Sequence, residues 1–463
     1  MFKSKSQKEK GLNIIIVGCG KVGATLTEQL SKESHAITLI DKNSLKIQHL
    51  TNAYDVMGLT GNGASYKVQM EAGIESADLL IAVTDSDELN LLCCTVAKRV
   101  GNCAAIARVR TPDYSEESAY LREKLGLAMI INPELAAATE VARLLYLPTA
   151  LEVNSFAHGQ VEIITFKLPK DNILVKKTIA VLGKKKISQN ILFCAVERSG
   201  EITIPSGTFR FAADDIISFI SSRESSRNFL KKIGFDTKQV NSTMIIGGGK
   251  SAYYLAKQLL PMGIKVKIIE NDTIRCNELS GLLPGAIIIN GDGTNEELLM
   301  EEGIEYVESF VPLTGIDEEN ILLTLFAREI SNAKVITKIN KINFKGVISN
   351  LDLGSVIYPK YITAEAIIAY VRAKKASMNS NIETLYHMFN SRVEAIEFLV
   401  EEESEVTNIP IMNMKLKKKL LLCCIYRKGR TIIPSGTDII IPGDKVVIVT
   451  THTGFDNIQD ILL

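Results

Sequence analysis

The sequence lacks a net charge, since lysine plus arginine and aspartate plus glutamate both number 53. A protein held electrostatically on nucleic acid or on an anionic membrane carries a basic excess, because phosphate charges must be neutralised. The balance therefore predicts no nucleic-acid partner. Two short lysine clusters, at 184–186 and 415–419, are offset by three glutamates at 401–403, and we interpret them as solvated faces.

The sequence also lacks any long apolar run. No stretch approaches the roughly 18 uninterrupted apolar residues of a membrane span. The apolar residues 14–17, behind a lysine-rich start at 1–10, are too few for a secretory signal. We therefore expect a cytoplasmic chain that does not itself cross a bilayer.

Cysteine pairs with metal-ligand spacing are missing as well. The eight cysteines include two vicinal pairs, Cys93-Cys94 and Cys423-Cys424, but no Cys-x-x-Cys. Zinc sites need such spacing, so no metal site is predicted. Both pairs lie in apolar runs, where free cysteine behaves as a small hydrophobe. We expect reduced, buried cysteines and a reducing compartment.

What is present is ordinary globular material, 463 residues long, 46% hydrophobic and 23% charged. This length is too great for one core and predicts about three to five domains.

The chain repeats itself at an offset of 229 or 230 residues. A repeat at fixed spacing indicates copies of one structural unit. Four landmarks recur in order: Gly18-Cys19-Gly20-Lys21 as Gly247-Gly248-Gly249-Lys250, Gly61-Asn62-Gly63-Ala64 as Gly291-Asp292-Gly293-Thr294, Asn90 as Asn320, and Ile204-Pro205-Ser206-Gly207 as Ile433-Pro434-Ser435-Gly436.

Each copy has two parts with different periodicity. The first part alternates β-branched runs with helical stretches, at 12–17, 22–31, 36–40, 45–52, 78–83, 88–99 and 105–109 in the first copy. This alternation predicts a doubly wound parallel α/β sheet of Rossmann type. The second part contains short strands separated by turns, at 191–197, 201–204 and 215–221, repeated at 420–427, 430–433 and 445–450. We expect a small α+β domain there.

The pattern divides the chain into four predicted domains. They are a first Rossmann-like domain at 11–133, a first small domain at 150–234, a second Rossmann-like domain at 241–362 and a second small domain at 380–463. Helical linkers are expected at 134–147 and 363–375, and a polar segment at 222–241 is expected to join the copies.

The first copy carries a Gly-x-Gly-x-x-Gly turn between a strand and a helix. Gly18 suits the tight turn, Gly20 lets the backbone approach a pyrophosphate, and Gly23 lets the helix pack on the strand. The helix N-terminus offers free N–H groups to the anion. Asp41 ends the next strand 23 residues after Gly18, where it suits ribose hydroxyls and repels a 2′-phosphate. The spacing favours NAD or an adenine nucleotide over NADP.

The second copy is less regular. Gly247 and Gly249 remain, Ala252 stands at the third glycine, and Glu270 follows Gly247 by 23 residues. A P-loop would require glycine where the chain has Met244, so that interpretation fails. Whether this copy binds a ligand stays open.

Two glycine loops, with Asn62 and Gly63 in the first copy and Asp292 in the second, follow the third strand of each copy. They line the adenosine side of the crevice, or they are loops shaped by glycine alone.

Four motifs together resemble the RCK (KTN) domains that regulate potassium conductance. In chain order they are residues 14–23, the glycine loops, Thr84-Asp85-Ser86-Asp87-Glu88-Leu89-Asn90 and Ile106-Ala107-Arg108-Val109-Arg110. The small parts, with Ile-Pro-Ser-Gly-Thr in both copies and Pro442-Gly443-Asp444 near the end, resemble the RCK C-terminal domain. The likeness begins near residue 11 and covers nearly the whole chain. Two full copies without a membrane span resemble in particular the peripheral regulatory subunits of Trk potassium-uptake systems.

The resemblance implies binding of NAD(H) or of ATP and ADP, and assembly into a ring, expected to be a tetramer. It also implies docking on the cytoplasmic face of a membrane potassium-transporting subunit. The family's nucleotide contacts fall on Gly18, Cys19, Gly20, Lys21, Val22, Asp41, Thr84, Asp85 and Arg108, and in the second copy on Gly247, Gly248, Gly249, Lys250, Ser251 and Glu270. Two departures are Asn62, where relatives often carry aspartate or histidine, and Lys338 as the counterpart of Arg108.

The alternative is an NAD-dependent dehydrogenase, since the same glycine turn serves hydride transfer. A dehydrogenase also needs a substrate domain with an acid such as histidine. The five histidines, at 35, 49, 158, 387 and 452, occupy no repeated or motif position. We therefore expect a nucleotide sensor without catalytic residues.

Overall fold

The computed structural model describes residues 11–33, 35–101, 103–235, 237–340, 348, 351–375, 382–389 and 392–463. The predicted lysine-rich start at 1–10, and residues 380–381 of the predicted last domain, lie outside these ranges. The chain forms two compact units, the first built mainly from residues up to Ala137 and the second mainly from Ala138 onward. Within the described ranges, no helix has both the length and the apolar character needed to cross a bilayer.

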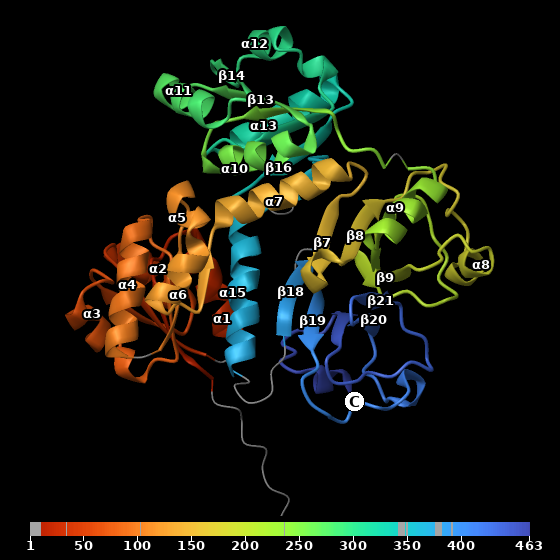
Figure 1. Ribbon diagram of the computed structural model, residues 1–463, viewed down its shortest axis with the longest axis horizontal. Helices are drawn as coiled ribbons and strands as arrows, with labels where there is room; N and C mark the ends of the chain where they lie inside the picture. Colours follow the sequence, from red (N-terminus) through yellow and green to blue (C-terminus); the bar gives the residue numbers. More distant parts are fainter. Residues whose placement is uncertain are drawn as a thin grey trace, which may run out of the picture. The chain divides into compact units, whose positions relative to one another are not determined.

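The first parallel sheet has six strands in the order β3-β2-β1-β4-β5-β6. Its central strands are continuous apolar runs, as expected for a sheet covered on both faces. The strands are β1 (Asn13–Val17), β2 (Ala36–Asp41), β3 (Met57–Thr60), β4 (Leu79–Ala82), β5 (Ala104–Arg108) and β6 (Met129–Ile131). The helices that Figure 1 shows around it are α1 (Lys21–Leu30), α2 (Ser44–Ala53), α3 (Tyr66–Glu71), α4 (Asp87–Val100), α5 (Pro112–Glu116) and α6 (Ser118–Leu125). Short η1 (Ser31–Glu33) and η2 (Ile74–Ser76) belong to the same part of the chain, and α7 (Pro133–Tyr146) follows β6.

Helix α4 shows why these segments are helical. The hydroxyl of Ser86 caps its start by accepting a hydrogen bond from the backbone N–H of Leu89. Acidic residues occupy its first turn and basic residues its last, which complements the helix dipole. Its inner face buries Cys93, Cys94 and Ala97 against the sheet.

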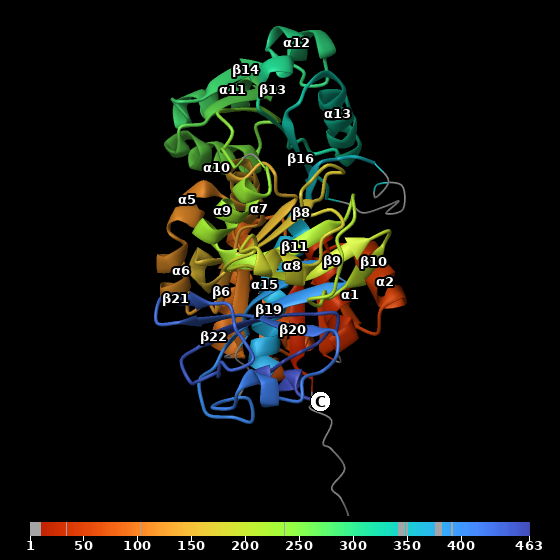
Figure 2. The same ribbon diagram turned by 90° about the vertical axis from the view of Figure 1, so that its right-hand side faces the viewer.

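The second parallel sheet repeats the first, in the order β14-β13-β12-β15-β16-β17. Figure 2 shows α11 and α13 on opposite sides of β13 and β14. The strands are β12 (Ser242–Ile246), β13 (Lys265–Glu270), β14 (Ile287–Asn290), β15 (Ser309–Pro312), β16 (Lys334–Lys338) and β17 (Ser355–Ile357). The helices are α10 (Lys250–Leu259), η4 (Leu260–Met262), α11 (Thr273–Leu282), α12 (Glu296–Glu301), η5 (Ile304–Tyr306), α13 (Asp317–Ile330) and α15 (Pro359–Lys375).

Each small domain is a five-stranded antiparallel sheet, with equivalent orders β10-β9-β11-β8-β7 and β18-β19-β22-β20-β21. The first contains β7 (Glu152–Phe156), η3 (Ala157–Gly159), β8 (Val161–Lys167), α8 (Ile179–Lys184), β9 (Leu192–Arg198), β10 (Glu201–Thr203), β11 (Ile216–Ser222) and α9 (Arg223–Lys232). The second contains β18 (Ile382–Met388), β19 (Val393–Leu399), η6 (Ile411–Asn413), β20 (Leu420–Arg427), β21 (Arg430–Ile432), β22 (Lys445–Thr450) and η7 (Ile458–Ile461).

The two small domains share one hydrophobic core. Ile163 and Cys194 of the first sheet belong to the same buried cluster as Ala395 and Cys423 of the second. In Figure 1, β7 and β8 lie beside β18 and β19. Each small domain contains one bidentate ion pair, Arg198 with Asp215 and Arg427 with Asp444. The guanidinium nitrogens lie 2.7–2.8 Å from the carboxylate oxygens. The Pro-Gly-Asp landmark thus holds the fold, since Asp444 is fully buried.

The predicted fold class is confirmed, with two doubly wound parallel sheets, each followed by a small antiparallel domain. All eight cysteines are free and buried, as expected. The joining segment at 222–241 is shorter than predicted, because its first half forms α9. Ser222 caps this helix, and Phe229 and Leu230 are buried in the first small domain.

Candidate nucleotide-binding crevice

The first crevice lies where the strand order of the first sheet reverses. Strand β1 is flanked by β2 and β4, so connections leave it in both directions and their loops separate at its carboxyl end. Ligands of open α/β sheets bind at such switch points. The predicted residues Gly18, Asp41, Thr84 and Arg108 all follow or end strands at this edge.

The three glycines of the turn differ in the space around their Cα atoms. Gly18 has φ of +102°, and a Cβ there would lie 2.9 Å from the backbone nitrogen of Thr84. A Cβ at Gly23 would lie 1.9 Å from the carbonyl oxygen of Gly18. A Cβ at Gly20, by contrast, would meet nothing within 4 Å. Gly18 and Gly23 are therefore required by packing, whereas Gly20 leaves open space at the start of α1.

The start of α1 fits an anion. The helix begins at Lys21 and Val22, and its first turn contains no acidic residue. Unpaired N–H groups and the helix dipole make such a terminus attractive to phosphate.

Asp41 holds the glycine turn from the end of β2. One carboxylate oxygen accepts the backbone N–H of Cys19 at 2.6 Å, and the other accepts that of Asn43 at 2.8 Å. Each oxygen retains a second lone pair, so a ribose hydroxyl can still donate to this carboxylate. Burial, with the Asp41 charge, raises the pKa of the Cys19 thiol to about 12, so this thiol stays neutral.

Asn90 organises the opposite side of the crevice. Its amide oxygen accepts from the backbone N–H of Thr84 (2.8 Å) and from the Thr84 hydroxyl (2.7 Å). Its amide nitrogen donates to the carbonyls of Thr84 and Arg108. The sequence marked Asn90 only as a repeat landmark. Its recurrence as Asn320 was the one signal that could have identified this role.

Arg108 lies beneath Thr84 at the end of β5. Its guanidinium donates to the carbonyl of Thr84 and lies 3.2 Å from a carboxylate oxygen of Asp85, which is 96% exposed. Burial lowers the pKa of Arg108, and the neighbouring Arg110 lowers it further. Among described residues, the buried Nε of Arg108 finds no hydrogen-bond partner. Arg110, absent from the predicted site, donates to the carbonyl of Asp85.

The glycine loop after β3 has a packing role. A Cβ at Gly63 would lie 2.1 Å from a methyl group of Val17. The buried amide of Gln69, another residue missed from the sequence, donates to the carbonyls of Gly63 and Cys93. The side chain of Asn62 accepts the backbone N–H of Ala64 at 3.2 Å. The structure thus gives a packing reason for Gly63 that does not require a ligand.

The second copy rebuilds the same turn. Gly247 has φ of +94°, and a Cβ at Gly249 would again meet nothing within 4 Å. Lys250 and Ser251 begin α10. Glu270 accepts the backbone N–H of Gly248 at 2.6 Å, as Asp41 does for Cys19.

The second crevice differs in its cations. Nζ of Lys338 donates to the carbonyl of Leu313 at 2.7 Å, and Gly315 stands in the place of Asp85. Arg275 of α11 donates from Nε to the carbonyl of Gly248 at 2.8 Å, which holds the turn from the other side. Hydrogen bonds from Thr294 lower the pKa of Asp292, so this carboxylate stabilises the loop in which it lies.

Two Rossmann-type domains in tandem, each followed by a small antiparallel domain, define a duplicated α/β protein. The TrkA-N domain family matches residues 14–133 and 243–359, and the TrkA-C domain family matches residues 163–234 and 395–463. The chain belongs to the TrkA family.

Full-length relatives agree with this assignment. "Trk system potassium uptake protein TrkA homolog 1" of Methanosarcina mazei is 30% identical over 97% of this chain and 99% of the relative. "Trk system potassium uptake protein TrkA" of Haemophilus influenzae is 31% identical over 94% of this chain and 95% of the relative.

Solved structures share the fold. The GsuK RCK domain matches with a TM-score of 0.63 and 17% identity, over 96% of this chain and 93% of that one. The GsuK channel bound to NAD matches with a TM-score of 0.62 and 17% identity, over 96% and 77%. GsuK bound to ADP matches with a TM-score of 0.50 and 15% identity, over 79% and 70%.

Proposed function

We propose that this chain is the nucleotide-sensing regulatory subunit of a potassium-uptake system, binding NAD(H) or ATP and ADP. One observation carries the proposal: the start of α1 is open at Gly20, and Asp41 and Arg108 end strands on opposite sides of β1. Its relatives are named Trk potassium-uptake proteins, and a channel of the same fold has been solved with NAD and with ADP.

Each crevice residue has a defined task in this proposal. The backbone from Gly18 to Val22 holds the pyrophosphate, and the remaining lone pairs of Asp41 accept the ribose hydroxyls. The partnerless Nε of Arg108 supplies a charged donor on the far side. Thr84 and Asp85 border this donor, and Asn90 fixes the position of Thr84.

The second crevice binds more weakly. Its turn and its acid are intact, but Arg275 and Lys338 already donate to carbonyls of the chain. A ligand would have to displace these hydrogen bonds, so its net binding energy would be only the difference between the new hydrogen bonds and the ones that are lost.

We further propose that the chain has no catalytic residues. His35 accepts the backbone N–H of Leu12 at the amino end of β1, opposite the crevice. His387 lies in the second small domain, 3.4 Å from both Glu365 and Glu394. The dehydrogenase alternative would need a proton donor beside a bound nicotinamide.

The proposal extends to assembly. We propose the domain division at 11–133, 150–234, 241–362 and 380–463, and a tetrameric ring on the cytoplasmic face of an integral-membrane potassium-transporting subunit. Moving a two-state equilibrium from about 1:99 to 99:1 needs roughly 5.5 kcal/mol of binding preference. Several sites in a ring provide this more readily than one site.

Calorimetry of the purified chain with NADH, NAD, ATP and ADP tests the binding. It should run beside a turnover assay with candidate alcohols and hydroxy acids. We expect binding without turnover. Catalytic reduction of NAD with any such substrate, or no binding of any of the four nucleotides, would overturn the proposal.

Sedimentation and small-angle scattering test the assembly. We expect a tetramer whose scattering curve changes between nucleotides, and potassium flux through the reconstituted membrane partner that follows the same nucleotides. A monomer with one scattering curve under all conditions would contradict the regulatory mechanism.

A further inference from the structure

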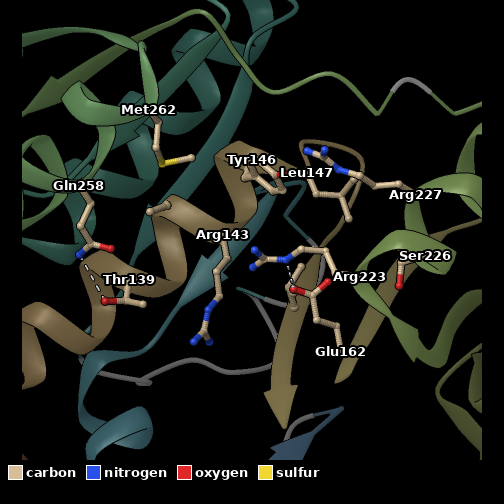
Figure 3. A pocket seen from close by; sticks show the side chains of 12 residues that line it. Thr139, Arg143, Tyr146, Leu147, Glu162, Arg223, Ser226, Arg227, Gln258 and Met262 are labelled. Atoms are coloured by element: carbon tan, nitrogen blue, oxygen red, sulfur yellow. Dashed lines mark hydrogen bonds and ion pairs between the residues drawn. The ribbon is translucent and has the colours of Figure 1, made fainter. Parts of the chain in front are cut away.

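A cavity lies within the second compact unit, and no residue of either glycine turn lines it. Its volume is about 420 Å³, and it opens between the end of α7, the strands β7 and β8, helix α9, and the end of the α10 segment. Figure 3 shows Arg143 of α7 and Arg223 of α9 extending into the same space, with Tyr146 above them. Its lining residues are Thr139, Ala142, Arg143, Tyr146, Leu147, Val153, Glu162, Arg223, Ser226, Arg227, Gln258 and Met262.

The cavity has more positive than negative charge. Three arginines and one glutamate line it, which leaves a net charge of two positive. Glu162 is 5% exposed and pairs with Nε of Arg223 at 3.0 Å. Within the described ranges neither Arg143 nor Arg227 makes an ion pair, although Arg143 contacts the hydroxyl of Tyr386 and its charge partly offsets the burial that raises the pKa of the nearby Glu140. The buried Nε of Arg227 makes no hydrogen bond to any described residue.

Tyr146 orders two of these guanidinium groups. The guanidinium carbon of Arg227 lies 3.9 Å from the centre of the Tyr146 ring, and that of Arg223 lies 5.4 Å from it. Stacking on an aromatic ring fixes the plane of a guanidinium and leaves its edge available for bidentate hydrogen bonds. The site is thus arranged before any ligand enters.

In the second copy, the equivalent position has an arginine whose charge is neutralised by an ion pair. Counted from the proline that begins each helix, Arg372 of α15 corresponds to Tyr146 of α7. Arg372 pairs with Glu394, the counterpart of Glu162, and both are at most 3% exposed. In the first copy this arginine is replaced by tyrosine, and α9 supplies the partner of Glu162 together with additional positive charge.

We propose that this cavity binds a small phosphorylated organic molecule. A phosphate dianion matches in charge the two guanidinium groups that make no ion pair, and its oxygens match their N–H groups in geometry. The volume falls in the ordinary range of small-molecule pockets and is much larger than a bare phosphate needs. Ala142, Val153 and Met262 provide apolar contacts for the organic part.

Such a ligand would tie α7 to α9. Helix α7 leads from the first parallel sheet to the first small domain, so the occupied cavity sets the end of this connection. None of the lining residues belongs to a glycine turn, and the site is separate from the proposed nucleotide crevices.

The absence of tryptophan from the chain gives a direct test. The variant Tyr146→Trp keeps an aromatic surface and adds a single fluorescent reporter to the cavity wall. Titration of this full-length variant with pyrophosphate and with ribose 5-phosphate, in saturating NAD to fill the glycine turns, should shift or quench the indole emission. Ribose 5-phosphate should bind more tightly than inorganic phosphate if the apolar wall contributes.

Arg227→Gln in the same background should weaken both titrations about tenfold or more, since a charge-assisted hydrogen bond is lost. Lys231→Gln is the matched control, because it removes an equal charge from an exposed position of the same helix. Circular dichroism checks that each variant folds.

An indole emission that does not respond to millimolar pyrophosphate or ribose 5-phosphate would overturn the proposal. Equal weakening by Lys231→Gln would also overturn it, because binding would then follow overall charge. Tighter binding of an acidic peptide than of ribose 5-phosphate would assign the surface to a protein partner instead. None of these outcomes bears on nucleotide binding at Gly20, which calorimetry measures separately.

Discussion

The two parallel-sheet domains have equivalent strand orders, similar glycine turns and an acid at the same place, yet the cations of their crevices differ. In the first, the Nε of Arg108 is buried without a partner among described residues. In the second, Lys338 and Arg275 donate to the chain's own carbonyls. Under the proposed function, nucleotide binding depends on whether donors at the strand ends remain available, and not on the fold alone.

The largest expected difference between the copies comes from Gly20→Val. The backbone there is extended, and a Cβ meets nothing in the protein, so the variant should fold normally. The branched side chain would fill the place of the pyrophosphate. We expect a loss of about a hundredfold or more in NADH affinity, the worth of two charge-assisted hydrogen bonds.

The matched variant is Gly249→Val. In calorimetry it should remove only a weaker second site and leave the tight site intact. If the two variants reduced nucleotide binding equally, the first crevice would not be the tighter site.

Asp41→Ala should cost roughly 1.5–3 kcal/mol of nucleotide binding, the usual worth of hydrogen bonds to a charged acceptor. The variant also frees the backbone N–H of Cys19, so thermal unfolding must be measured beside affinity. Glu270→Ala should have a smaller effect on the total heat of binding. An unchanged affinity in folded Asp41→Ala would remove this residue from the site.

Exchanging the cations tests the comparison directly. Arg108→Lys should weaken binding about fivefold, because lysine keeps the charge but loses a hydrogen bond of roughly 1 kcal/mol. Lys338→Arg should strengthen the second site if a guanidinium there leaves a donor available. Fluorescence titration with NADH measures both, and a stronger site in Arg108→Lys would contradict the role given to Arg108.

The last comparison concerns stability and α7, where Glu140 corresponds to Ala366 of α15 when counted from the initial prolines. Burial, together with Glu152 and Glu365, raises the pKa of Glu140 to about 8 from 4.5. The native state therefore holds a proton that the unfolded chain releases between these values. The stability linked to this proton is present below pH 4.5 and is lost as the pH rises through about 8.

Urea unfolding between pH 6 and pH 9 checks this linkage. In Glu140→Gln, the free energy of unfolding should decrease less as the pH rises. In Glu123→Gln, a change at an exposed residue of α6, it should follow the parent chain. Identical profiles for Glu140→Gln and the parent would show that Glu140 does not carry the effect.

The sequence could predict what depends on local spacing. The repeat, the alternation of strands and helices, and the strand that leads into Gly18-Cys19-Gly20 all appear within short windows. The paired acids Asp41 and Glu270 followed from their distance to these turns.

What it could not predict depends on side chains that meet only after the strands assemble. Asn90 reaches Arg108 across a helix and a strand, and Arg223 reaches Glu162 over 61 residues. The sequence left two interpretations of the glycine loop open, and it could not show the close approach of Gly63 to Val17. Helix α9 was mistaken for a linker because only two of its ten residues, Phe229 and Leu230, are apolar and buried.

The common core of the two small domains has a consequence for how this protein can change. In a homodimer every substitution appears on both sides of the two-fold axis. Here the partners are one polypeptide, so a substitution at Ile163 alters one face and leaves its counterpart Ala395 untouched. Tethering also gives each domain an effective concentration in the millimolar range relative to the other, and dilution does not separate them. The duplicated chain can therefore evolve an asymmetric pair without losing the pairing itself.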